Sequence, residues 1–103
     1  MATVADLVDE DALAALVDDP AIVLAGDELA DTGAVRLIES GPLRVVAEVD
    51  DGGGTAEVEL AAVEGRLEWA CDCADGVEGR ACRHLVAAAR ETRREAAGRR
   101  GLG

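Results

Sequence analysis

The feature that most constrains this 103-residue chain is a cluster of metal-binding side chains near its C-terminal end. All three cysteines and the only histidine lie within residues 71–84, as a Cys-Asp-Cys motif and a Cys-Arg-His motif separated by eight residues. Three thiolates with one imidazole favour Zn²⁺, and four such ligands form the filled shell of a structural site. The sequence therefore predicts a single structural zinc site whose ligands are Cys71, Cys73, Cys82 and His84.

Other interpretations of the cluster stay open at this stage. A disulfide between Cys71 and Cys73 would close a small, strained ring and is disfavoured in a reducing compartment. Buried, inert cysteines beside a surface histidine are typical of scattered residues rather than of so tight a cluster. A catalytic Cys–His pair needs an activated thiol, whereas the neighbouring Asp72 and Asp75 raise a thiol pKa. A three-ligand zinc with a bound water is the remaining alternative. We expect no enzymatic activity.

The segments on either side of the cluster are expected to be a strand and a helix. Apolar and polar residues alternate from Leu67 to Cys71, and residues Ala81–Ala97 return to a helical period. Two glycines between the motifs let the backbone fold back. Because residues two apart on a helix point about 200° from each other, we expect Cys82 in the cap or first turn, from where it can share a metal with His84.

The N-terminal third of the chain is predicted to be helical. Residues Thr3–Asp18 show apolar positions at helical spacing, with a capping box at the start. Asp19 is suited to cap a second helix over Pro20–Ala30, and Gly33 is its expected terminator. The short β-branched run at residues 22–24 leaves a strand as the alternative for this second segment.

After Gly33 the pattern changes to the alternation of a half-buried sheet. Short strands are expected at Ala34–Glu39, Leu43–Asp50 and Ala56–Ala62, separated by turns rich in Gly and Asp. Together with the strand that ends at Cys71, they give a small antiparallel meander of three to four strands. The predicted fold class is α+β, with N-terminal helices and a C-terminal helix. Since the chain has one aromatic residue and a core of small aliphatic side chains, the zinc site would act as a staple.

The charge of the chain is −12 and unevenly distributed. Residues 1–79 contain three Arg against twenty Asp or Glu, whereas residues 80–103 contain seven Arg against two Glu. Arg83, Arg90 and Arg94 fall on one side of the C-terminal helix and are candidates for contact with nucleic acid or a partner. The acidic remainder would repel a polyanion. These arginines could also form a solvated helix face or dock onto the acidic body of the chain itself.

Nothing in the sequence indicates contact with a membrane. No apolar run approaches the roughly 20 residues that a transmembrane helix needs, and the acidic first ten residues do not resemble a secretory signal. We therefore expect a cytoplasmic protein, in a compartment where thiols stay reduced. An odd number of cysteines also argues against a disulfide framework.

The arrangement Cys-x-Cys, variable loop and Cys-x-His at a helix start resembles the SWIM-type zinc finger. Residues 82–87 are similar to the family's Cys-Lys-His-hydrophobic-x-Ala ending, with Arg in place of Lys, and residues 25–35 look like the helix and Gly-x-Val lead-in of bacterial members. The resemblance covers roughly residues 20–90. The Tyr that often precedes the valine of the third strand is missing, and residues 55–58 stand there. The resemblance implies the same four zinc ligands and a small stand-alone prokaryotic member.

This resemblance also shapes the expected organisation and role. We expect an N-terminal helix over residues 1–19, a SWIM-like zinc-binding domain over residues 20–97 and a disordered tail over residues 98–103. SWIM fingers are associated with DNA-related proteins and are thought to bind DNA or protein. The resulting hypothesis is a protein-interaction adaptor whose partner is another protein. The alternative is a DNA-binding or DNA-transaction accessory protein that uses the Arg-rich C-terminal helix.

Overall fold

The computed structural model describes the backbone of residues 2–102 and the side chains of residues 2–98. Within this range the chain forms five helices and a four-stranded antiparallel sheet in the order β1-β2-β3-β4. The strands are β1 (Val35–Ser40), β2 (Arg44–Asp50), β3 (Thr55–Val63) and β4 (Arg66–Cys71). The predicted α+β class and antiparallel meander are therefore confirmed.

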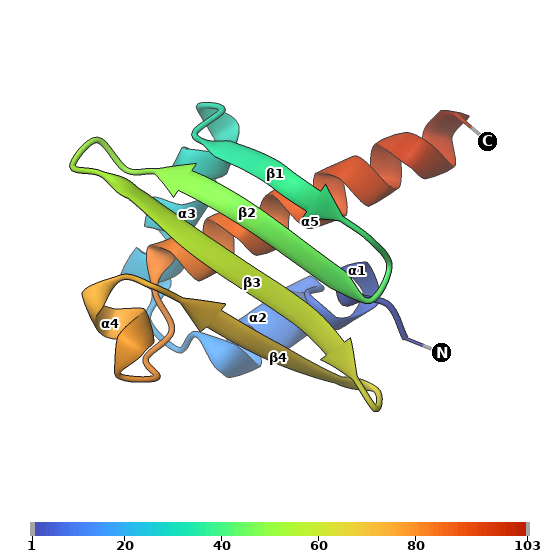
Figure 1. Cartoon of the computed structure of the whole chain (residues 1–103), viewed down its shortest axis with the longest axis horizontal. Coiled ribbons are helices and arrows are strands. Elements are labelled where there is room, and N and C mark those ends of the chain that lie inside the picture. The colour runs from blue at the N-terminus through green and yellow to red at the C-terminus, as the bar shows by residue number, and fades with distance from the viewer. Residues whose placement is uncertain (1, 103) are drawn as a thin grey trace.

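The helices cover one face of the sheet. They are α1 (Val4–Leu7), α2 (Glu10–Leu16), α3 (Pro20–Asp31), α4 (Ala74–Val77) and α5 (Arg83–Leu102). Helices α1 and α5 form the layer against the strands, and α3 packs mainly on α5. Figure 1 shows α5 crossing behind the sheet, with α1, α2 and α3 on the same side and α4 beside the end of β4. The core lies between these two layers. Its fully buried members include Val45, Val58 and Leu60 of the sheet and Leu85 of α5.

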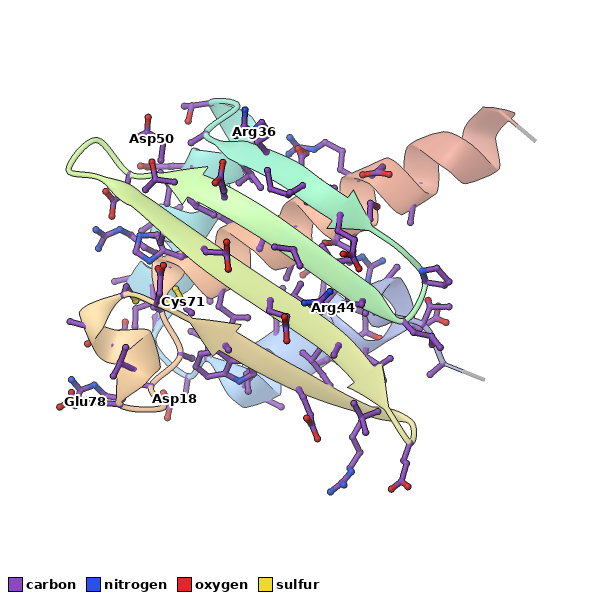
Figure 2. All side chains as sticks on the ribbon, in the orientation of Figure 1. Asp18, Arg36, Arg44, Asp50, Cys71 and Glu78 are labelled. Atoms are coloured by element: carbon purple, nitrogen blue, oxygen red, sulfur yellow. The ribbon has the colours of Figure 1, made fainter. Side chains whose placement is uncertain are left out.

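The two faces of the sheet differ as the alternation predicts. Val45, Ala47 and Val49 of β2 point into the core and are almost fully buried. The opposite face carries charged side chains such as Arg36 and Arg44, which Figure 2 labels on the open side of the sheet. These arginines pair with carboxylates of neighbouring strands across solvent-exposed contacts, which contribute little to stability.

The N-terminal segment differs from the single helix that we predicted over Thr3–Asp18. It forms two short helices, because the Asp9 carboxylate accepts a hydrogen bond from the Ala12 N–H at 2.8 Å and starts a new helix there. The predicted capping box at the start of α1 is present. Val4, Val8 and Leu13 are buried in the same core as the sheet and α5, so this segment is packed into the main body.

The prediction of a second helix from Pro20 is confirmed, and the strand alternative at residues 22–24 is wrong. Asp19 caps this helix through the Ala21 N–H at 2.9 Å, and Gly33 follows it with a φ of 77°. Helix α3 packs closely on α5 at Gly26. A Cβ atom there would lie 2.4 Å from Val86 Cβ, so only glycine permits this approach.

The C-terminal helix differs from its predicted bounds of Ala81–Ala97 at both ends. It begins at Arg83 and its backbone stays helical through Leu102, where we expected a disordered tail from residue 98. Among the described residues, Gly98 is not one of the glycines with a positive φ. Its backbone therefore does not adopt the left-handed conformation that commonly ends a helix. Residue 103 lies outside the described part of the chain.

Candidate metal centre

The four predicted ligands are held at the ends of three structural elements. Cys71 is the last residue of β4, and Figure 2 labels it beside α4. Cys73 is the N-cap of α4, Cys82 immediately precedes α5 and His84 lies in the first turn of α5. The expectation that Cys82 lies outside regular helix is therefore confirmed, and the ligands reach one point from three directions.

The ligand atoms of these residues converge. All lie within 4.8 Å of one another, and Cys71 Sγ is 3.8 Å from His84 Nδ1. In a tetrahedral zinc site, with Zn–S near 2.3 Å and Zn–N near 2.0 Å, ligand atoms lie about 3.5–3.8 Å apart. The group therefore needs only small side-chain shifts to enclose an ion. Cys71, Cys82 and His84 are each about 95% buried, so these residues could hold a metal ion away from solvent.

The loop between the two motifs contains helix α4, which the sequence did not lead us to expect. This single turn brings the Gly76 N–H within 3.3 Å of Cys73 Sγ, so the thiol sulfur accepts a backbone hydrogen bond. A Cβ atom at Gly76 would lie 2.4 Å from the Cys71 carbonyl oxygen. Glycine is thus required for α4 to pack against the end of β4, and this packing sets the distance between Cys71 and Cys73.

A carboxylate that sequence reasoning missed completes the outer part of the site. Asp51, in the turn between β2 and β3, places Oδ2 2.7 Å from His84 Nε2 and 2.9 Å from an Arg83 nitrogen. The Gly53 N–H donates to its other oxygen at 3.0 Å. The Asp51 carboxylate can only accept, so His84 Nε2 donates this hydrogen bond, and the other ring nitrogen, Nδ1, faces Cys71 Sγ at 3.8 Å. Metal-binding histidines commonly have such a carboxylate partner.

The local environment sets the acidity of these groups. Burial raises the pKa of the Cys71 and Cys82 thiols above their usual range. Burial acts in the same sense on Cys73, but hydrogen bonds from the Gly76 N–H and from His84 outweigh it and lower the pKa of Cys73 to about 7. Hydrogen bonds from His84, Gly53 and Arg83 hold the pKa of Asp51 well below its usual range. The site therefore presents one acidic thiol, and a metal would displace protons from the other two.

A cavity gives access to the ligands. It has a volume of about 420 Å³ and lies between the start of α3 and the loop that carries the cysteines. Ala21 and Ile22 of α3 line it on one side, and Cys73, Cys82 and His84 line it on the other. An ion can therefore approach the ligand group without unfolding of the core.

The arginines predicted for nucleic-acid or partner contact are each paired with carboxylates of the chain itself. Arg83 pairs with Asp51 at the site described above. Arg90 is mostly buried, with its Nε 2.6 Å from Asp27 Oδ1 and its Nη1 2.7 Å from Glu10 Oε1. Its side chain thus ties α5 to both α2 and α3.

Arg94 is also engaged within the chain. It lies 2.8 Å from Asp31 Oδ1 and donates to the Ala30 carbonyl oxygen at 3.0 Å. A longer contact of 3.6 Å joins it to Glu91 on the same helix. The three arginines therefore match the alternative in which the helix docks onto the acidic body of the chain.

Comparison of the chain with family models, with curated proteins and with solved structures found no match in any of the three. The resemblance to SWIM-type fingers therefore depends on the motif residues themselves. In the part of the chain that the structure describes, no helix is both long and apolar enough to cross a bilayer.

Proposed function

We propose that this chain is a zinc-binding module of the SWIM type, with a structural Cys₃His site, that acts as a protein-interaction adaptor. The observation that carries the metal assignment is the convergence of the four ligand atoms to within 4.8 Å. Three thiolates and one imidazole are soft and borderline ligands, which favour Zn²⁺ over Mg²⁺ or Ca²⁺. Cys71, Cys73, Cys82 and His84 would fill a tetrahedral shell and leave no position for a reacting water.

The role of zinc in this proposal is mechanical. The ion would join the end of β4, the α4 loop and the start of α5. Structural zinc contributes roughly 10–16 kcal/mol of apparent binding energy to small fingers. Because Val58, Leu60 and Leu85 form a core without the metal, we expect a loosened rather than an unfolded metal-free protein.

The adaptor role is supported by the charge and by the exposed apolar side chains. Arg83, Arg90 and Arg94 are paired with carboxylates, so phosphates of a nucleic acid would compete with existing ion pairs. Large apolar side chains such as Leu24 and Val77 are 61% and 75% exposed. Exposed apolar groups on an acidic surface favour a protein partner over a polyanion.

Elemental analysis of protein purified without added metal tests the zinc site. We expect one zinc per chain in the native protein and its loss in a Cys82→Ser, His84→Ala double variant, together with a lower melting temperature. An Arg36→Gln variant, changed at an exposed residue of the open sheet face, should keep its zinc. Native protein that contains no zinc, with stability unaffected by the double change, would overturn the proposal.

Retention on immobilised duplex DNA separates the two candidate roles. We expect no specific retention at 150 mM salt, because the net charge is −12 and the three arginines are already paired. The matched variant replaces all three arginines by Gln. Tight, salt-dependent retention of the native protein that this variant loses would favour the DNA-binding alternative.

A further inference from the structure

A groove lies between α2 and α3, on the far side of α3 from the candidate metal centre. Its volume is about 670 Å³. Leu13 and Val17 form a buried floor, 2% and 5% exposed. Val23 and Leu24 of α3 form a wall, and the Leu24 side chain is 61% exposed. The groove therefore offers apolar area to a partner while its floor belongs to the folded core.

The ends of the groove are charged. At one end Arg90 bridges Glu10 and Asp27, which fixes the spacing of α2 and α3. At the other end Asp18 is exposed and forms no salt bridge among the described residues. Residues 1–35, which contain both helices of the groove, hold nine Asp or Glu and no Lys or Arg. Three carboxylates and one guanidinium line the groove itself, so its lining carries a net negative charge.

We propose that the α2–α3 groove binds an amphipathic helix of a partner protein, with leucine-like side chains on one face and Lys or Arg along its edges. This inference rests on the proposed adaptor role and names the class of partner. A groove between two helices takes a third helix through anchors at i, i+3, i+4 and i+7. Helix α3 has 12 residues, which is about 18 Å or three turns, and this length suits two to three such anchors. Basic edges would complement the carboxylates around the groove.

Synthetic helical peptides test the proposal on the whole 103-residue chain, purified as in the zinc analysis. The first probe is a 15-residue peptide with Leu at the anchor positions and Arg along both edges. The second keeps every Arg but replaces Leu by Ser, and the third keeps Leu but replaces Arg by Glu. We expect measurable binding of the first peptide and at least about ten-fold weaker binding of the other two, since the groove requires both apolar area and positive charge.

Matched variants locate the binding surface. Leu24→Asn removes an apolar wall residue without adding charge and should weaken the first peptide about five-fold or more. Ile38→Asn changes a similarly exposed leucine-sized residue on β1, 53% exposed, and should leave affinity unchanged. Asp18→Asn should weaken binding by a smaller factor and reduce its salt dependence. Thermal unfolding of each variant shows whether the fold is retained.

The possible outcomes distinguish failure of the groove proposal from failure of the zinc-site proposal. Equal effects of Leu24→Asn and Ile38→Asn would overturn the proposal that the groove binds the peptide. Equal binding of the Leu and Ser peptides would overturn it as well. Self-association of the native protein that Leu24→Asn abolishes would also overturn it, because the occupant would then be a second copy. Zinc is measured on the same samples: one zinc per chain without peptide binding rejects only the groove, whereas loss of zinc with peptide binding intact rejects only the metal centre.

Discussion

Asp51 Oδ2 lies 2.7 Å from His84 Nε2, which links the turn between β2 and β3 to the first turn of α5. The carboxylate side chain is only 16% exposed, and Arg83 shares the same oxygen. The contact fixes which nitrogen of the imidazole faces the three sulfurs. Asp51 is therefore a positioning residue for the proposed zinc ligand His84, and not a ligand itself.

Replacing Asp51 by Asn should weaken zinc binding about 10- to 100-fold, as loss of a carboxylate partner does at other metal sites. The amide keeps the size of the side chain but removes the charge that orients and polarises His84. Competition with a chromophoric chelator measures the affinity, and the absorption spectrum of the cobalt-substituted protein reports the ligand set. That spectrum should still show three thiolates.

Asp50→Asn is the matched control for this change. Asp50 is the neighbouring, exposed carboxylate, and it accepts a hydrogen bond from the Gly52 N–H at 3.0 Å within the same turn. Zinc affinity should be unchanged in this variant. If both changes lower affinity equally, the effect belongs to the shape of the turn and the positioning role of Asp51 is wrong.

Gly76→Ala should lower both stability and zinc affinity. The new methyl group would lie 2.4 Å from the Cys71 carbonyl oxygen, which is backbone and cannot rotate away. Overpacking of this kind costs about 1–3 kcal/mol. Chemical denaturation with zinc bound measures the loss.

The control for Gly76 is Gly98→Ala in α5, where a Cβ atom meets nothing within 4 Å. Alanine favours a helix over glycine by up to about 1 kcal/mol, so this variant should be slightly more stable. A Gly76→Ala protein as stable as the native protein would mean that α4 does not pack against the ligand strand.

Arg90→Gln should destabilise the protein by about 1–2 kcal/mol. The Arg90 side chain is 21% exposed, and loss of its guanidinium would leave Asp27 of α3 without its partner and detach Glu10 of α2. The ion pair between Arg36 and Glu48 serves as the comparison, because the Arg36 side chain is 75% exposed. Arg36→Gln should change the free energy of unfolding by less than about 0.5 kcal/mol. Urea unfolding of the two variants measures the difference, and equal effects would contradict a structural role for Arg90.

Zinc binding should release protons, and its affinity should rise with pH. The pKa values of Cys71 and Cys82 are raised by burial, so both thiols are protonated near pH 7 without metal. The pKa of Cys73 is about 7, so this thiol is largely ionised at pH 8 and largely protonated at pH 6. Zinc should thus displace about two thiol protons at pH 8, and the number released should approach three as the pH falls through 7. Calorimetry in buffers of different ionisation enthalpy counts them; a count near zero at pH 8 would be inconsistent with thiol ligands of raised pKa.

Most of the candidate site could be predicted from the sequence, because cysteine and histidine are rare in this chain. Three cysteines and one histidine lie within fourteen residues, so their convergence required only a strand end, a helix start and a loop. Asp51 could not be predicted in this way. It is one of 22 carboxylates and lies 33 positions from His84 along the chain, and only the pairing of β2 with β3 brings its turn to the start of α5.

Local sequence patterns also failed to predict some of the helix boundaries. The spacing of apolar residues over Thr3–Asp18 is compatible with one helix, and the Asp9 cap that divides it is a competing local signal. Conversely, the tail predicted from residue 98 is helical, because glycine ends a helix only when its backbone turns left-handed and Gly98 is not among the described glycines with positive φ. In the N-terminal segment, the division into two helices goes with the burial of Val4, Val8 and Leu13 in the main core.

The sequence alone determined the antiparallel meander, the presence of helices in the N-terminal and C-terminal parts of the chain, and the four candidate ligands. Alternation in β2 and β3, helical period after residue 81 and the two cysteine motifs are properties of neighbouring residues, and their physics is local. Only the tertiary structure decided that Asp51 contacts His84, that Arg90 binds Glu10 and Asp27, and that a groove opens between α2 and α3. These contacts join residues far apart in the chain, and they exist because burial of one shared core fixes where each element lies.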